Sequence, residues 1–186
     1  MLDSDPINAD LQPCLPYVSV IFLGRGTLDD LRAGVQLSQP SDLAEFLSGF
    51  RHTAPALTGD PAAMERVALE FCEDAAANGL VYVEARFCPH LIVNSTPKQG
   101  EATADDILEA VLRGFAQGRA DFGVHVEALL CCIRGLPQFD RDILRLCEKY
   151  RGRGVVGIDI AGDEGGLKIE DPLMFDKQVS MHIKLI

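Results

Sequence analysis

Long apolar runs are absent from this 186-residue sequence. No run approaches the roughly 20 residues that a helix needs to cross a bilayer, so we expect no membrane insertion. The one leader-like stretch, residues 17–23, follows Asp3, Asp5 and Asp10, whereas a secretory signal begins with basic residues. We therefore expect a cytoplasmic protein.

The sequence also lacks any pair of cysteines spaced as Cys-x-x-Cys. Its six cysteines stand at positions 14, 72, 88, 131, 132 and 147, several of them inside apolar runs. Cys131 and Cys132 are adjacent, and adjacent residues on one strand face opposite ways. This distribution is typical of small buried side chains in a reducing cytosol rather than of a disulfide framework or a metal site.

Basic residues are few: 17 Lys and Arg stand against 28 Asp and Glu, for a formal net charge of -11. Such a surface repels phosphate backbones and anionic lipid, which argues against nucleic acid and membrane partners. Uncharged or cationic small molecules remain open as ligands. The length and the 47% apolar content predict one compact domain with a hydrophobic core.

Helices and strands alternate from residue 60 onward. Asp60-Pro61, a capping carboxylate followed by proline, predicts a helix start, and Gly79 predicts its end. Thr103 with Asp106 predicts a capping box on a second helix, and a third helix is expected to start near Asp140. The predicted strands are Leu80–Phe87, Val124–Cys132 and Val155–Ala161. This alternation is typical of an α/β fold with parallel strands and crossover helices, either an open sheet or part of a barrel.

The two ends of the chain differ from this middle part. Residues 1–26 show no regular period, although residues 17–23 could add a fourth strand, and residues 165–186 show no clear pattern. Before the alternating block, Ser41–Phe50 predicts a short amphipathic helix. Its apolar side chains fall on one side, at Leu43, Phe46, Leu47 and Phe50.

Three segments carry a resemblance to a known family. They are VYVEARFCPHLIVNS (Val81–Ser95), DFGVHVEALLCCIR (Asp121–Arg134) and VVGIDIAGDE (Val155–Glu164). In order and spacing they resemble the second, third and fourth strands of the adenosine deaminase family. Thr27–Phe50 resembles the helical gate over that family's nucleoside pocket. The similar region is residues 27–164, with divergent segments at 1–26 and 165–186.

The resemblance implies part of a (β/α)8 TIM-type barrel, with three to four parallel strands and crossover helices. It also implies hydrolytic deamination of adenosine and deoxyadenosine to inosine and deoxyinosine in purine metabolism. In the family, zinc lowers the pKa of a bound water, and the resulting hydroxide attacks the purine. The family's zinc ligands are a His-x-His pair on the first strand, a later His and a later Asp. A Glu that follows the later His protonates the ring, and a further His orients the hydroxide.

The chain departs from the family pattern at these ligands. Its four histidines, at positions 52, 90, 125 and 182, form no His-x-His pair. If Pro16–Gly26 aligns with the family's first strand, the two ligand positions hold Ile21 and Leu23, which cannot coordinate a metal. We therefore expect no zinc bound by this chain, no catalytic or metal-binding residue, and no activity of the chain alone. It resembles an incomplete copy of the enzyme.

The resemblance does carry over residues for purine nucleoside binding. Gly162 matches the position whose backbone N–H binds the purine ring, and Leu43, Phe46, Leu47 and Phe50 match the apolar gate. The alternatives are that Gly162 is only a turn glycine and that the four apolar residues pack into a core. His90 is expected to be a hydrogen-bonded structural residue. Glu84 and Arg86 share a strand face and are expected to form an ion pair.

Two other functions remain open from the sequence. The chain could be a non-catalytic member that binds a nucleoside or a partner protein, or an unrelated α/β enzyme that uses Asp163 and Glu164 beyond a strand end. A partial barrel would expose two sheet edges and an apolar interior, which predicts self-association through those edges.

Overall fold

The computed structural model describes residues 42–94 and 100–162, with isolated positions 29, 32, 36 and 39 and without the side chains of Arg51 and His52. The possible strand at 17–23, the acidic pair Asp163 and Glu164, and the segment 165–186 lie outside the described residues. The chain divides into two compact units, Met1–Thr58 and Gly59–Ile186, and each is considered by itself.

Within residues 42–58, the first unit forms two short helices and a 3-10 turn: α4 (Leu43–Ser48), α5 (Phe50–Thr53) and η1 (Ala54–Ala56). Asp42 caps α4, because its carboxylate accepts a 2.8 Å hydrogen bond from the Glu45 backbone N–H. The helix predicted at Ser41–Phe50 is therefore present, but it is divided at Gly49 into two pieces.

In its described residues, the second unit begins with α6 (Pro61–Ala77) and contains three helix-strand repeats. The strands are β1 (Tyr82–Phe87), β2 (His125–Ile133) and β3 (Val155–Ala161), and they are joined by α7 (Ala104–Phe122) and α8 (Asp140–Tyr150). Short 3-10 turns follow the first two strands, η2 (Pro89–Leu91) and η3 (Pro137–Phe139). Each predicted helix and strand of this unit is present, with strand limits that differ from the prediction by at most two residues.

Local signals in the sequence set the limits of the helices. The Asp60 carboxylate accepts a 3.0 Å hydrogen bond from the Ala63 backbone N–H, and Pro61 opens α6. Thr103 and Asp106 form the predicted capping box of α7. That helix ends at Gly123, whose φ of 74° is a left-handed conformation that glycine adopts without strain. Sequence pattern alone therefore locates both helices.

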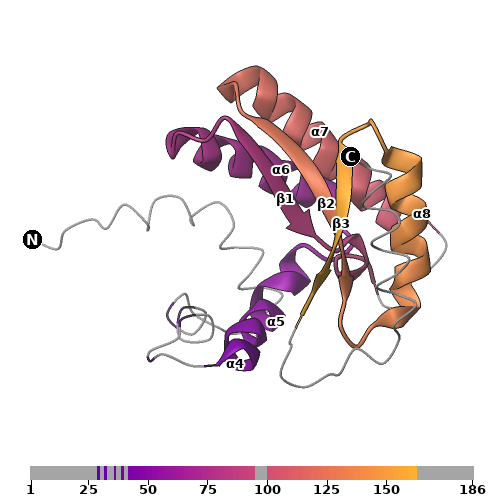
Figure 1. Cartoon of the computed structure of the whole chain (residues 1–186). Helices are drawn as coiled ribbons and strands as arrows, with labels where there is room; N and C mark the ends of the chain where they lie inside the picture. Colours follow the sequence, from indigo (N-terminus) through magenta and orange to yellow (C-terminus); the bar gives the residue numbers. More distant parts are fainter. Residues whose placement is uncertain are drawn as a thin grey trace, which may run out of the picture. The chain divides into compact units, whose positions relative to one another are not determined.

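The three strands form one parallel sheet in the order β1-β2-β3 (Figure 1). Tyr82 to Phe87 pair in register with His125 to Leu130, and Ala128 to Ile133 pair with β3, with one irregularity between Ala128 and Leu129. Parallel neighbours joined by single helices are the repeat of a (β/α) barrel. The second unit is therefore α/β, and its sheet is part of such a barrel.

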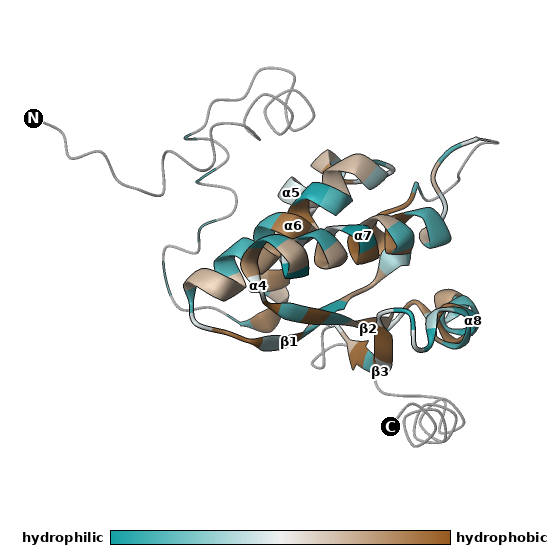
Figure 2. Cartoon of the chain, turned by 90° about the horizontal axis from the view of Figure 1, so that it is seen from above, coloured by the Kyte–Doolittle hydropathy of each residue, from teal (hydrophilic) through white to brown (hydrophobic). Residues whose placement is uncertain are grey.

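The core of this unit lies between one face of the sheet and the helices. Figure 2 shows α6 and α7 on one side of β1 and β2. On β2, Val126, Ala128 and Leu130 are buried, whereas the residues that alternate with them as far as Leu129 are only half-buried. Fully buried partners on the helices include Ile107 and Leu108 of α7 and Ile143, Leu146 and Cys147 of α8. The opposite face of the sheet is the one that a closed barrel would turn inward.

Candidate functional site

The strands of a parallel sheet bring their carboxyl ends to one edge, where (β/α) barrels hold their substrates. Here that edge follows Phe87, Ile133 and Ala161. Gly162 comes directly after β3, with a φ of 104° that side-chain-bearing residues rarely adopt. The glycine is half-buried. A Cβ at this position would stand 3.4 Å from the Arg134 backbone N and 3.5 Å from Ile133 Cγ2. The structure thus requires glycine here for its backbone conformation.

Arg134 lies next to this glycine, just beyond the end of β2. Its backbone N–H donates a 2.9 Å hydrogen bond to the Ala161 carbonyl. Its side-chain Nη1 donates to the Ile160 carbonyl at 3.1 Å and to the Gly162 carbonyl at 3.4 Å. The contacts of Arg134 with β3 depend on the fold and leave no local signal in the sequence.

The open face of the sheet is polar where β1 and β2 lie side by side. Tyr82 and Glu84 stand in register with His125 and Glu127. The Tyr82 hydroxyl donates to Glu84 Oε1 at 3.0 Å, and the His125 ring is hydrogen-bonded to the Glu127 carboxylate. Partial burial and then the hydrogen bond with Glu84 raise the pKa of Tyr82. The sequence predicted an apolar interior for a partial barrel, and this prediction is wrong for this part of the face. The face carries polar side chains here, and they are hydrogen-bonded to one another.

Arg86 belongs to the same open face, and its ion-pair partner differs from the prediction. Its Nη1 lies 3.2 Å from Asp159 Oδ2 on β3, and Glu84 is hydrogen-bonded to Tyr82 instead. The expected pairing of Glu84 with Arg86 is therefore wrong. Both residues do lie on one face, but the long Arg86 side chain reaches across β2 to the outer strand.

His90 is hydrogen-bonded, as the sequence predicts. Its Nε2 lies 2.9 Å from Asp142 Oδ2, and its ring stacks on Phe139 with centroids 5.0 Å apart. The side chain is only 9% exposed. Within the described part of the chain, its buried Nδ1 has no hydrogen-bond partner. His90 joins the loop after β1 to the start of α8.

The thiols near this edge are buried, and they form no disulfide among the described residues. Cys88, Cys131, Cys132 and Cys147 are each no more than 6% exposed. Burial raises the pKa of Cys131 and of Cys147 to about 12, so both stay protonated at neutral pH. They pack as small apolar side chains, which agrees with the interpretation of the sequence.

A zinc site needs at least three nitrogen, oxygen or sulfur ligands on one ion. Across residues 42–94 and 100–162, no three His, Cys, Asp or Glu side chains converge closely enough to hold a metal. The described residues therefore do not fit a zinc ion, and no zinc-dependent step is assigned to them.

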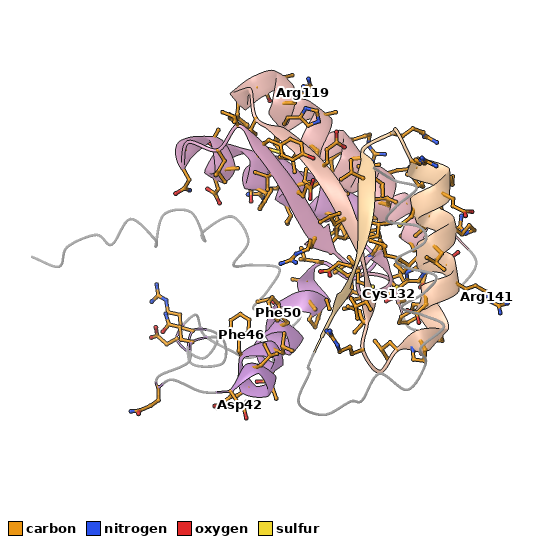
Figure 3. All side chains as sticks on the ribbon, viewed as in Figure 1. Asp42, Phe46, Phe50, Arg119, Cys132 and Arg141 are labelled. Carbon is orange, nitrogen blue, oxygen red and sulfur yellow. The ribbon has the colours of Figure 1, made fainter. Side chains whose placement is uncertain are left out.

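The predicted gate residues all lie on the short helices of the first unit. Leu43, Phe46 and Phe50 are 46%, 53% and 56% exposed, and Leu47 is half-buried. The Phe46 and Phe50 rings meet edge to face at 5.7 Å (Figure 3). These side chains form an exposed apolar surface rather than a core, so the packing alternative is not seen within this unit.

A cavity of about 410 Å³ lies elsewhere in the second unit, between α6, α7 and β1. Its lining includes Val67, Phe71, Phe87 and Phe115, and the polar residues that border it are Glu84 and Arg86.

Among the helices that the structure describes, none combines the length and the apolar character that a membrane span requires.

Comparisons with known proteins agree with this architecture. The adenosine deaminase family profile matches residues 19–183. Adenosine deaminase of Bos taurus is 37% identical over 173 residues, which cover 89% of this chain and 47% of the relative. That of Xenopus tropicalis is 38% identical over 151 residues, or 77% of this chain and 42% of the relative. The chain thus spans about half the length of these relatives.

Solved structures show the same fold at lower identity. The N6-mAMP deaminase of Arabidopsis superposes with a TM-score of 0.72 at 23% identity, over 92% of this chain and 52% of that one. A Burkholderia ambifaria amidohydrolase with bound Zn gives 0.67 at 22% identity, over 89% of this chain and 44% of that one. Arabidopsis ADAL complexed with GMP gives 0.70 at 23% identity, over 90% and 51%. From the matched residues and the barrel repeat together, the chain belongs to the adenosine deaminase family.

Proposed function

We propose that this chain carries the purine-contacting middle strands of a nucleoside deaminase. In the complete enzyme, the reaction is hydrolytic deamination of adenosine and deoxyadenosine in purine metabolism. The chain by itself binds the nucleoside but does not turn it over. Family membership supports the reaction class, and the solved neighbour with GMP supports a purine ligand for this fold.

The observation that carries the proposal is the backbone at Gly162. It follows a buried parallel strand at the edge where barrel enzymes bind substrate, and it has a positive φ and no side chain. A flat purine ring can therefore approach the peptide backbone closely and accept a hydrogen bond from the Gly162 N–H. Such a contact recognises a ring nitrogen without needing any charged group.

A separate proposal concerns the apolar gate residues of the first unit, which we propose contact a nucleoside. Leu43, Phe46 and Phe50 expose apolar and aromatic surface that suits the faces of a base and a sugar. Stacking of a base on an aromatic side chain is worth about 1–3 kcal/mol. A nucleoside, rather than a free phosphate, is the ligand that fits this surface and the formal net charge of -11.

Lack of turnover follows from the zinc ligands. The described residues do not form a metal site, and if Pro16–Gly26 aligns with the family's first strand, Ile21 and Leu23 stand where the family has two histidines. Without a bound cation, water is too weakly acidic to act as a nucleophile at neutral pH. We also propose a cytoplasmic location, which suits buried free thiols.

The test is binding and turnover of adenosine by the purified chain. Calorimetric titration should show adenosine binding that Gly162→Ala weakens by about tenfold or more, because alanine is strained at this φ and displaces the peptide. The matched control is Gly79→Ala, since Gly79 has a φ of 76° and no atom lies within 4 Å of the place where a Cβ would stand. It should leave binding unchanged.

Purine absorbance should stay constant when the chain is incubated with adenosine and zinc. Turnover at enzyme-like rates would contradict the proposed inactivity. Equal binding by the wild type and Gly162→Ala would remove Gly162 from the site.

A further inference from the structure

Arg134 holds the end of β3 through both its backbone and its side chain. The backbone N–H pairs with the Ala161 carbonyl at 2.9 Å. The guanidinium Nη1 reaches the carbonyls on either side of that residue, Ile160 at 3.1 Å and Gly162 at 3.4 Å. One residue just beyond β2 therefore contacts three successive carbonyls at the end of β3 and directly after it.

This arrangement constrains the peptide that leads into Gly162. Gly162 has no side chain, and its φ of 104° lies in a region that glycine explores freely. A glycine after a strand end can rotate its carbonyl at little cost unless that carbonyl is bound. The Gly162 N–H lies in the same peptide plane as the Ala161 carbonyl, which the Arg134 backbone N–H binds. The guanidinium binds the carbonyls on either side of that peptide and so limits rotation at its two ends, which fixes the direction of the Gly162 N–H.

The chemistry of the guanidinium suits this role. Its donors are held in one plane, so that a single group can serve two carbonyls in a fixed direction. A lysine ammonium would supply a point charge on a flexible stem and would orient the peptide less well. The Arg134 side chain is half-buried, which limits competition from water for these carbonyls.

We propose that Arg134 is a positioning residue that orients the Gly162 backbone for contact with the purine. It acts through Gly162 and does not itself touch the ligand. This inference rests on the proposed function, because it assigns the contact to Gly162. It adds that nucleoside affinity depends on an arginine at the end of the neighbouring strand.

The experiment compares Arg134→Met, Arg134→Lys and the wild type by two measurements. The first is the shift and hydrogen exchange of the Gly162 amide in a ¹⁵N-labelled chain. The second is the adenosine dissociation constant. Arg134→Met should move the Gly162 amide signal, speed its exchange and weaken adenosine binding by about tenfold. For Arg134→Lys, both the Gly162 amide exchange and the adenosine dissociation constant should lie between those of the methionine variant and those of the wild type.

The matched control is Arg113→Met, which breaks an ion pair with Glu65 at 2.8 Å on the helices and should change neither measurement. Unchanged affinity and an unchanged Gly162 signal in folded Arg134→Met would overturn the inference. So would a fall in thermal stability while the folded fraction keeps its affinity, because that pattern indicates a purely structural role. If Arg134→Met does not fold, wild-type affinity in Arg134→Lys, with an unmoved Gly162 signal, overturns it instead.

The two proposals fail separately. If the wild type binds no adenosine, the proposed function fails, whereas the amide measurements still decide whether Arg134 orients Gly162.

Discussion

At the scale of single residues, Asp140 is an acid placed where charge is costly. It opens α8 and is only 5% exposed. Within residues 42–94 and 100–162, neither of its carboxylate oxygens has a hydrogen-bond partner of ordinary geometry. Burial raises the pKa of its carboxyl, and the nearby Cys132 thiol lowers it only in part. The folded chain therefore holds this proton more tightly than the unfolded chain does.

A pH dependence follows from this raised pKa. As pH rises past the ordinary carboxyl range, the unfolded chain loses the Asp140 proton first, so the free energy of unfolding falls until the folded carboxyl also ionises. Asp140→Asn should remove this loss and stabilise the fold by about 1 kcal/mol at pH 7, with no gain at acid pH. Urea denaturation at both pH values measures the difference. Asp74→Asn, at an exposed position, is the control. It should change the free energy of unfolding by nearly the same amount at both pH values.

Contacts between distant residues mark the limit of what the sequence predicts at this scale. Asp60-Pro61 and the Thr103–Asp106 box act over three or four residues, and both were predicted correctly. The partners of Arg86 and Arg134 depend on strand register, which local spacing does not contain. Gly162 was singled out by resemblance alone, since a glycine after a strand otherwise predicts only a turn.

At the scale of elements, α6 and α7 pack unusually closely because of two glycines one turn apart. A Cβ on Gly114 would stand 2.4 Å from the Glu65 carbonyl oxygen, and one on Gly118 would stand 2.3 Å from Cys72 Cβ. Neither distance is possible for real atoms. The Gly-x-x-x-Gly spacing is present in the sequence, but the periodicity of the larger apolar residues predicts the helix without indicating how closely it packs.

Replacement of Gly118 tests this packing. Alanine favours a helix over glycine by about 1 kcal/mol, whereas overpacking costs about 1–3 kcal/mol. Because Cys72 is fully buried and its Cβ is fixed to a helix, we expect the cost of the clash to exceed the gain in helix propensity. Gly118→Ala should therefore lower the free energy of unfolding by about 1–2 kcal/mol in urea denaturation. Gln117→Ala, at an exposed position of the same helix, should stay within about 0.5 kcal/mol of the wild type.

The third predicted strand agrees with β3 at both ends, because an almost continuously apolar run bounded by glycine leaves little choice of limits. The first was predicted two residues too early. Leu80 is apolar, but its N–H bonds the Ala75 carbonyl and so completes the end of α6. An apolar residue such as Leu80 can either begin a strand or complete the end of a helix, and its hydropathy does not distinguish the two.

At the scale of the whole molecule, the sheet of the second unit has an outer strand on each side. Among the described strands, β1 and β3 each pair only with β2. Near β1, Leu80, Val81 and Tyr82 are 48%, 78% and 50% exposed. Unpaired edges beside exposed apolar residues promote pairing between chains.

We therefore expect concentration-dependent association, measured by sedimentation velocity. Val81→Lys should weaken it, because a charge at an edge opposes strand pairing, whereas Val81→Thr should leave it nearly unchanged. A wild-type chain that stays monomeric at every concentration, with a sharp unfolding transition, would contradict this expectation. The polar open face makes association through the edges more favourable than stacking of faces.

The ion pair between Arg86 and Asp159 joins the two outer strands over the central one. An ion pair that spans three strands on the open face draws the two outer strands together on that face, and so bends the sheet toward it. Three strands held in this way favour the curvature that a closed barrel needs, before any further strand is added. Loss of the ion pair in Arg86→Met would therefore relax the curvature of the sheet while leaving each hydrogen-bonded ladder in place.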